Sequence, residues 1–93
     1  MRFEWDDGKN NANFKKHRVW FEEAQTVWAD KKSQEYYDPD HSDNEDRFIR
    51  IGHSTKPNLL LVVFCERNGG DTIRIISARK ATKEEERDYE KTI

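Results

Sequence analysis

Four short segments of the chain have the hydrophobic pattern of β-strands. Three of them alternate apolar and polar residues with the two-residue period of a strand that has one buried face. The fourth is apolar throughout, which is typical of a strand covered on both faces. The three alternating segments and the apolar one are residues 2–5, 47–52, 73–78 and 59–65, respectively.

Apolar positions after the first strand follow a different period. We expect the DDG triplet at residues 6–8 to end that strand, and from about Asn11 the apolar residues recur at three- and four-residue steps. This stripe predicts either one amphipathic helix or two helices in sequence. Its members are Phe14, His17, Phe21, Ala24 and Trp28.

The polar segment over residues 30–47 is rich in Asp, Ser and Asn, and it predicts a loop with a few extended residues around Tyr36 and Tyr37. Short polar connectors then separate the last three strands. They predict two hairpins, and therefore an antiparallel three-stranded meander.

The C-terminal segment has a helix start signal. Thr82 followed by Glu85 predicts a capping box that begins a helix over residues 83–91. Beyond Tyr89 and Ile93 this helix has few apolar side chains, so it gains little from burial. We expect it to be the least stable element of the fold.

These elements predict an α+β fold in one domain over residues 1–93, with an N-terminal strand and helices packed on an antiparallel sheet and a C-terminal helix. A chain of 93 residues is too short for two separate cores. With 39% charged residues, it has no apolar run long enough to span a membrane. The N-terminus lacks the apolar core of a signal peptide and the lone Cys65 cannot form an internal disulfide, so we expect a cytoplasmic protein.

The formal net charge of −2 means that any binding of a polyanion must rely on a local basic patch. Such a patch is predicted around the last strand. Regular alternation places Arg74 and Lys80 on one face and Arg79 on the other, whereas a bulge near Ser77 would bring Arg79 round to join them. Arg67 closes the preceding strand and can approach Arg74 across the hairpin. With few acids between them, these cations suit phosphate binding; the alternative is solvated cations that blunt a sheet edge.

Cleavage of RNA without a metal ion needs a base for the 2′-hydroxyl, cations for the charge that develops on phosphorus, and an acid for the leaving oxygen. His17, Glu66 and Lys80 are the candidates for proton transfer, with the arginines as clamps. His17 has an alternative role as a helix-capping or surface residue. We expect Cys65 to be inert packing. No histidine or cysteine pair has a metal-binding spacing, so neither a metal nor a cofactor is expected.

Five segments, in this order, resemble the BrnT family of toxins from bacterial type II toxin–antitoxin systems: FEWDDGKNNANFKKH, FEEAQTVWAD, DPDHSDNEDRFIRIGHS, LLLVVFCER and IRIISARKATKEEERDYE. The resemblance covers nearly the whole chain. It implies a RelE-like fold, metal-independent endoribonuclease activity that inhibits translation, and neutralisation by a BrnA-type antitoxin with a ribbon-helix-helix domain. It also implies a heterotetramer of two toxins and two antitoxins, which contacts promoter DNA through the antitoxin.

The resemblance also implies which residues act. RelE-like enzymes use basic residues on the sheet and near the C-terminal helix, which here points to Arg67, Arg74, Arg79 and Lys80. His17, a candidate for proton transfer on its own chemistry, completes the expected catalytic set. The expected substrate contacts are Lys16, Glu66 and Tyr89. The expected antitoxin contacts are the aromatic residues Trp20, Tyr36 and Tyr37.

The chain departs from the family pattern after His17. Where the family has Gly and then Ser or Thr, this sequence has Arg18 and Trp20. A Gly would end the first helix in a left-handed conformation, and a hydroxyl residue would cap the next helix together with Glu23. Arg18 in that conformation costs about 1 kcal/mol, and the lost cap costs about as much again. Either the break is strained or the helices merge, and we expect Arg18 to contact phosphate or the antitoxin.

Two other functions remain open from the sequence. One is a catalytically inactive toxin-like protein that acts only through antitoxin binding and promoter autoregulation. The other is a nucleic-acid-binding domain without chemistry, which would bind RNA in a strongly salt-dependent way. The basic cluster favours the nuclease, because a pure binding module has no need for four cations gathered at one place.

Overall fold

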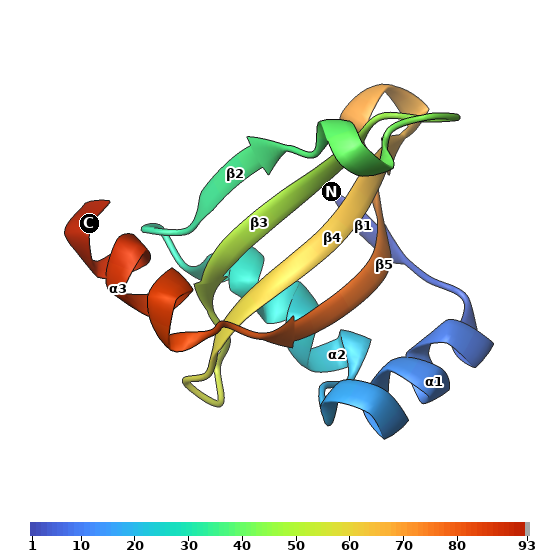
Figure 1. Ribbon diagram of the computed structural model, residues 1–93. Coiled ribbons are helices and arrows are strands. Elements are labelled where there is room, and N and C mark those ends of the chain that lie inside the picture. The colour runs from blue at the N-terminus through green and yellow to red at the C-terminus, as the bar shows by residue number, and fades with distance from the viewer. Residues whose placement is uncertain (93) are drawn as a thin grey trace.

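The computed structural model describes residues 1–92, without the side chain of His41; Ile93, which we assigned to the apolar side of the last helix, lies outside the described residues. A five-stranded sheet in the order β1-β5-β4-β3-β2 has α1, α2 and η1 on one face and α3 across one end of the other (Figure 1). No helix in the described part is long and apolar enough to cross a membrane. The strands are β1 (Arg2–Glu4), β2 (Gln34–Tyr37), β3 (Arg47–His53), β4 (Leu59–Arg67) and β5 (Thr72–Lys80). The helices are α1 (Asp7–His17), α2 (Phe21–Ala24) and α3 (Lys83–Thr92), with 3-10 turns η1 (Gln25–Ala29), η2 (Pro39–His41) and η3 (Asn68–Gly70).

The sheet confirms the α+β class and the antiparallel meander, because β3, β4 and β5 pair consecutively in antiparallel fashion. Each predicted strand is present. The parallel pairing of β1 with β5 and the antiparallel pairing of β2 with β3 complete the two edges. Strand β1 pairs only with residues 72–74, so most of β5 has a strand on the β4 side alone.

The core lies between the sheet and the helices α1 and α2. Its members are Val19, Phe21, Ala24, Val27, Leu60, Val62, Phe64, Ile73, Ile75 and Ala78. The prediction that β4 is covered on both faces is wrong in part. Leu61 and Val63 point to the other face and stay half-buried, whereas Cys65, farther along the same face, is buried.

A β-bulge interrupts β5. Across the strand pair, Ile75 and Ser77 oppose consecutive residues of β4, so Ile76 is an extra residue. The bulge reverses the alternation of faces beyond it, and Ala78 is therefore buried on the same face as Ile75. The sequence left this bulge open as an alternative to a regular strand.

Helix α1 begins at Asp7 rather than near Asn11. Asp6, which we expected to end the first strand without starting a helix, is the N-cap of α1, and its side chain accepts a hydrogen bond from the Lys9 N–H at 2.9 Å. An Asp after a strand suits both a turn and a helix cap, and here the cap prevails.

Buried asparagines, rather than the apolar stripe, hold α1 against the sheet. The Asn13 side chain donates to the carbonyl oxygens of Val19 and Ala78, both at 2.8 Å, and accepts from the Ala78 N–H at 3.1 Å. Asn13 thus satisfies the free edge of β5 as a neighbouring strand would. This arrangement fixes α1 beside the bulge.

The helices after His17 are broken, not merged. Arg18 is left-handed, with φ 60° and ψ 29°, and its N–H donates to the Phe14 carbonyl oxygen at 2.8 Å. Trp20, the N-cap of α2, makes no side-chain cap. Instead, the side chain of Asn10 on α1 caps α2, because its Oδ1 accepts a hydrogen bond from the Phe21 N–H at 2.8 Å. The missing local cap is therefore replaced by a tertiary one.

Helix α3 starts with the predicted capping box. The Glu85 N–H donates to Thr82 Oγ1 at 3.1 Å, and the Thr82 N–H donates to Glu85 Oε1 at 2.9 Å. Within α3 only Tyr89 is buried. The low stability of this helix stays a prediction, which the sparse burial supports.

Candidate functional site

Strand β5 sorts its cations by face. Arg79 pairs across the sheet with Leu61, which lies on the face that α3 partly covers, whereas Lys80 pairs with Leu60 in the core. Because of the bulge, Arg79 shares the face of Arg74 and Lys80 does not. The alternation expected for a regular strand is therefore wrong.

Arg67 and Arg74 meet at one carboxylate. Glu4 Oε2 on β1 lies 3.0 Å from Arg74 Nη1 and 3.9 Å from Arg67 Nε, and Arg67 Nη2 lies 3.3 Å from Glu45 Oε2. The predicted approach of Arg67 to Arg74 is confirmed. The carboxylate between them was not foreseen, because β1 is distant in the sequence.

Arg79 is held by α3. Its Nη1 and Nη2 atoms donate to Glu85 Oε1 and Oε2 at 2.7 and 2.9 Å, a bidentate pair of charges. The hydrogen bonds from Arg79 lower the pKa of Glu85 to about 2, and the same pair raises the pKa of Arg79. The expectation of few acids near these arginines is wrong: a phosphate group must share or displace the carboxylates.

A second cationic site lies where α1 meets the bulge. Lys9, Lys16 and His17 line a shallow hollow together with Ile76 and Ser77. The side chains of Lys16 and His17 make no hydrogen bond or ion pair within the described part of the chain. A phosphate group could reach this site without displacing a carboxylate.

Lys9 is the residue of this site that sequence reasoning missed. It lies seven residues before Lys16, two helical turns, and so on the same face of α1. That spacing was visible in the sequence. It was overlooked because the helix was expected to begin only near Asn11.

Two predicted substrate contacts lie elsewhere. Glu66 pairs with Ile73, so its side chain lies on the helix-covered side and away from Arg67. Tyr89 is 3% exposed, and its hydroxyl donates to Asp30 Oδ2 at 3.2 Å. Burial raises the pKa of Tyr89 to about 12. Tyr89 anchors α3, and its hydroxyl would have to leave Asp30 to contact a substrate.

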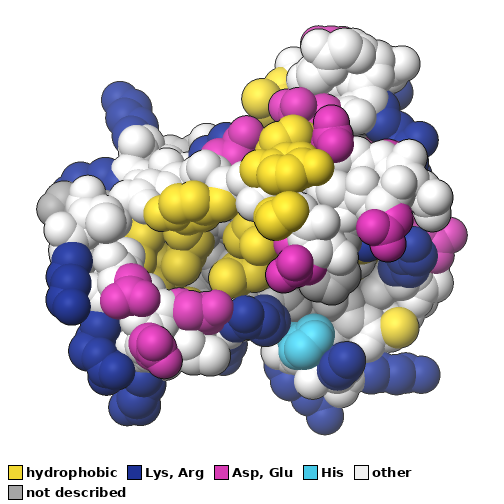
Figure 2. All heavy atoms as spheres, turned by 45° about the horizontal axis from the view of Figure 1, so that its top comes forward, with side chains coloured by type: hydrophobic (Ala, Val, Ile, Leu, Met, Phe, Trp, Pro, Cys, Tyr) yellow, Lys and Arg dark blue, Asp and Glu magenta, His cyan; other side chains and the backbone are white. Residues whose placement is uncertain are grey.

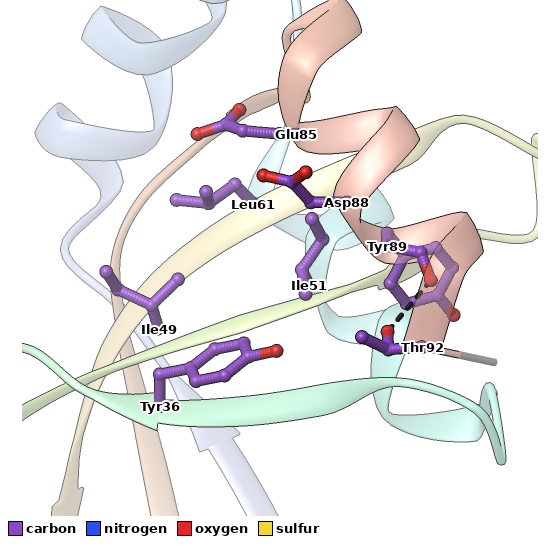
Figure 3. A pocket seen from close by; sticks show the side chains of 8 residues that line it. All are labelled: Tyr36, Ile49, Ile51, Leu61, Glu85, Asp88, Tyr89 and Thr92. Atoms are coloured by element: carbon purple, nitrogen blue, oxygen red, sulfur yellow. Dashed lines mark hydrogen bonds between the residues drawn. The ribbon is translucent and has the colours of Figure 1, made fainter.

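The apolar hollow lies between α3 and the uncovered face of the sheet (Figures 2 and 3). Tyr36 on the edge strand β2 lines it and is 51% exposed, whereas Tyr37, 52% exposed, contacts the Phe48 ring on the opposite face of the sheet. Trp20 lies at the junction of α1 and α2, near the opposite edge of the sheet (Figure 1). The three expected antitoxin contacts therefore do not share one surface. The hollow has a volume of about 310 Å³ and is lined by Tyr36, Ile49, Ile51, Leu61, Glu85, Asp88, Tyr89 and Thr92.

Cys65 fits the expected packing role. It is 1% exposed, and burial raises the pKa of its thiol, which keeps it protonated and unreactive. Across the described residues, no group of three His, Cys, Asp or Glu side chains is placed to hold a metal ion.

Comparison with known protein families identifies the family of this chain. Residues 5–85 match the family described as the ribonuclease toxin BrnT of type II toxin–antitoxin systems. The chain belongs to the BrnT toxin family. The crystal structure of the Brucella abortus ribonuclease toxin BrnT, at 1.1 Å resolution, is similar with a TM-score of 0.64 and 25% sequence identity, over 89% of this chain and 99% of that one. No curated protein matches the sequence.

Membership of the BrnT family confirms the resemblance seen in the sequence. The family consists of ribonuclease toxins, and a type II system pairs such a toxin with an antitoxin. The arginines of β5 and the hollow beside His17 are therefore features of a BrnT-family protein.

Proposed function

We propose that this BrnT-family chain cleaves RNA without a metal ion, at the bulged part of β5. One observation carries the proposal. The bulge at Ile76 turns Arg79 to the face of Arg74, and the same bulge forms the floor of the hollow that His17 and Lys16 line. The proposed phosphate clamps and the proposed proton-transfer group therefore border the same short stretch of β5.

The proposed reaction is an attack of the ribose 2′-hydroxyl on the neighbouring phosphate. The 2′-oxygen attacks phosphorus while a base takes its proton, the bond from phosphorus to the 5′-oxygen breaks, and that oxygen takes a proton from an acid. The products are a 2′,3′-cyclic phosphate and a 5′-hydroxyl. Imidazole is a common general acid or base, so we assign His17 to one of the two proton transfers and water to the other, on the opposite side of phosphorus. Arg74 and Arg79 stabilise the charge on the phosphoryl oxygens, and Arg67 binds the backbone nearby.

The carboxylates that hold the arginines do not prevent this role. Glu4 and Glu85 are partly exposed, with 42% and 29% of their side-chain surface accessible. Ion pairs at such exposure contribute about 1 kcal/mol or less. RNA phosphates can therefore replace them, and until then the pairs keep the guanidinium groups in place.

The biological setting follows from the same proposal. Residues 1–93 act as one RelE-like toxin domain in the cytoplasm, where cleavage of RNA inhibits translation. A BrnA-type antitoxin with a ribbon-helix-helix domain neutralises the toxin in a heterotetramer of two toxins and two antitoxins, and it brings the complex to promoter DNA. Exposed aromatics are efficient interface anchors, so Tyr36, which lines the apolar hollow, and its exposed neighbour Tyr37 on β2 are the proposed antitoxin contacts.

A second candidate function is a catalytically inactive toxin that acts only through its antitoxin. The observation in its favour is that Arg67, Arg74 and Arg79 are each neutralised by a carboxylate in the free protein. In that case the arginines serve the fold alone.

Induced expression in bacteria separates the two functions. The native chain is compared at matched protein levels with Arg79→Ala, Arg67→Ala and a control, Arg87→Ala, which changes an exposed residue of α3. We expect growth arrest and RNA fragments from the native chain and the control only. Purified protein should still cleave RNA in EDTA. A folded native chain that causes no arrest and no cleavage would support the inactive toxin.

A further inference from the structure

The junction of α1 and α2 breaks two local rules side by side. Arg18 occupies a left-handed conformation that suits Gly, and Trp20 stands at a helix N-cap where Ser, Thr, Asp or Asn is preferred. Such violations concentrate where a side chain serves a function. The side chains at both positions contact the same third residue, Phe14.

Phe14 and Trp20 form a parallel stack, with ring centroids 4.1 Å apart and an angle of 10° between the planes. The Arg18 guanidinium carbon lies 5.5 Å from the centre of the Phe14 ring. Despite the stack, 37% of Trp20 is exposed. An indole held flat by a neighbouring ring, with surface left open, is a preformed aromatic platform.

Cations surround this platform. The last turn of α1 contains Lys15, Lys16 and His17, and Arg18 follows directly. Lys16 and His17 also line the hollow at the bulge of β5. The aromatic platform and the proposed phosphate site therefore share the end of one helix.

We propose that Trp20, supported by Phe14 and Arg18, stacks on a base of single-stranded RNA next to the cleaved phosphate. The inference rests on the proposed ribonuclease function and adds a contact for its substrate. Single-stranded RNA is recognised by aromatic side chains that stack on bases beside cations that follow the backbone, and the end of α1 offers both. Tyr36 differs, because it borders an apolar hollow whose lining includes Glu85 and Asp88.

The test is the affinity for a short single-stranded RNA with 2′-O-methyl sugars, which cannot be cleaved because the nucleophile is blocked. Trp20→Ser removes the ring but supplies the missing N-cap hydroxyl, so its melting temperature should stay close to native. Its Kd should rise at least about fivefold. Trp20→Phe, which keeps a ring, should bind nearly as well as the native chain. On a matched oligonucleotide without bases, native and Trp20→Ser should bind alike.

Each other outcome has a distinct meaning. If the native chain binds and cleaves RNA but Trp20→Ser binds it equally well, the inference is overturned and the ribonuclease proposal stands. If the native chain neither binds nor cleaves RNA, both are overturned. If Trp20→Ser loses affinity for the antitoxin alone, the platform is a protein contact and the inference is overturned. Should Trp20→Ser fold poorly, Arg18→Gly decides, since it should bind RNA more weakly while melting at a higher temperature.

Discussion

Helices α1 and α3 both lie against the cationic part of β5, but they are held in different ways. Buried amides attach α1: Asn10 and Asn13 are each 7% exposed, and their side chains satisfy backbone groups of β5 and α2. Helix α3 is attached by the ion pair of Arg79 with Glu85 and by its one buried side chain, Tyr89. Buried hydrogen bonds are costly to break, whereas exposed ion pairs exchange easily.

This difference assigns different roles to the two flanks of the site. His17 and Lys16 at the end of α1 have a fixed position relative to the bulge. Arg79 is fixed only as long as α3 stays docked. RNA or the antitoxin can therefore act on α3 without disturbing the sheet, and α1 provides the rigid part of the site.

The largest expected effect on stability is at Asn13, which attaches α1 to β5. Asn13→Ala should lower the free energy of unfolding by about 3 kcal/mol or more, because it leaves buried backbone groups of Val19 and Ala78 without partners. Denaturant titration measures this loss. Asn11→Ala, an exposed neighbour on the same helix, is the matched control and should change stability by less than about 0.5 kcal/mol. A loss below 1 kcal/mol for Asn13→Ala would contradict the firm attachment of α1.

A smaller and local effect is expected at Tyr89. Tyr89→Ala removes the buried ring and should reduce the hydrogen-exchange protection of α3 by at least about tenfold, while the sheet keeps its protection. Tyr89→Phe removes only the hydrogen bond to Asp30 and should have a lesser effect. Equal loss of protection in β4 and α3 would show that α3 is not independently releasable.

The ion pair of α3 predicts a pH dependence. The folded-state pKa of Glu85 is about 2, below its ordinary value of 4.5, so the carboxylate stabilises the docked helix above about pH 4.5 and loses this effect as the pH falls toward 2. Near neutral pH, the free energy that keeps α3 docked should be about 1 kcal/mol larger in the native chain than in Glu85→Gln. This difference is small because solvent screens a partly exposed ion pair. Circular dichroism should show the two converging near pH 2. A difference that persists there would exclude the ion pair as its cause.

The smallest effect is expected at the break between the helices. Arg18→Gly should raise the free energy of unfolding by up to about 1 kcal/mol, because Gly adopts φ 60° without strain. Thermal unfolding measures the gain. Lys15→Gly, within regular helix, should instead destabilise by about 1 kcal/mol. If Arg18→Gly also destabilises, the contact of Arg18 with Phe14 outweighs the backbone strain.

The sequence patterns identified four of the five strands and the capping box of α3, because these depend on local periodicity and on residues three apart. They missed how α1 is attached. Asn10 and Asn13 do not register in an apolar pattern, although they form the buried face of the helix. Polar residues that pair with a distant strand edge leave no periodic signal.

The sequence predicted which cations gather at the candidate site, but not which acids pair with them or which face of the sheet each side chain occupies. The gathering of Arg67, Arg74 and Arg79 was visible in the sequence. Their carboxylate partners come from β1, from the loop before β3 and from α3, which only the tertiary fold brings together. The side on which Lys80 lies depends on one bulged residue, and a shift of one residue reverses every face beyond it.

Arg79 and Lys80 give the most direct test of the site, since they are neighbours in sequence and lie on opposite faces of β5. The measurement is the rate at which purified native chain, Arg79→Gln and Lys80→Gln cleave RNA in EDTA, with Arg87→Gln as the charge control. We expect native cleavage to persist without metal, Arg79→Gln to lose about 100-fold or more, and Lys80→Gln to lose much less. A larger loss in Lys80→Gln than in Arg79→Gln, or no cleavage by the folded native chain, would contradict a ribonuclease site on the Arg74 and Arg79 face.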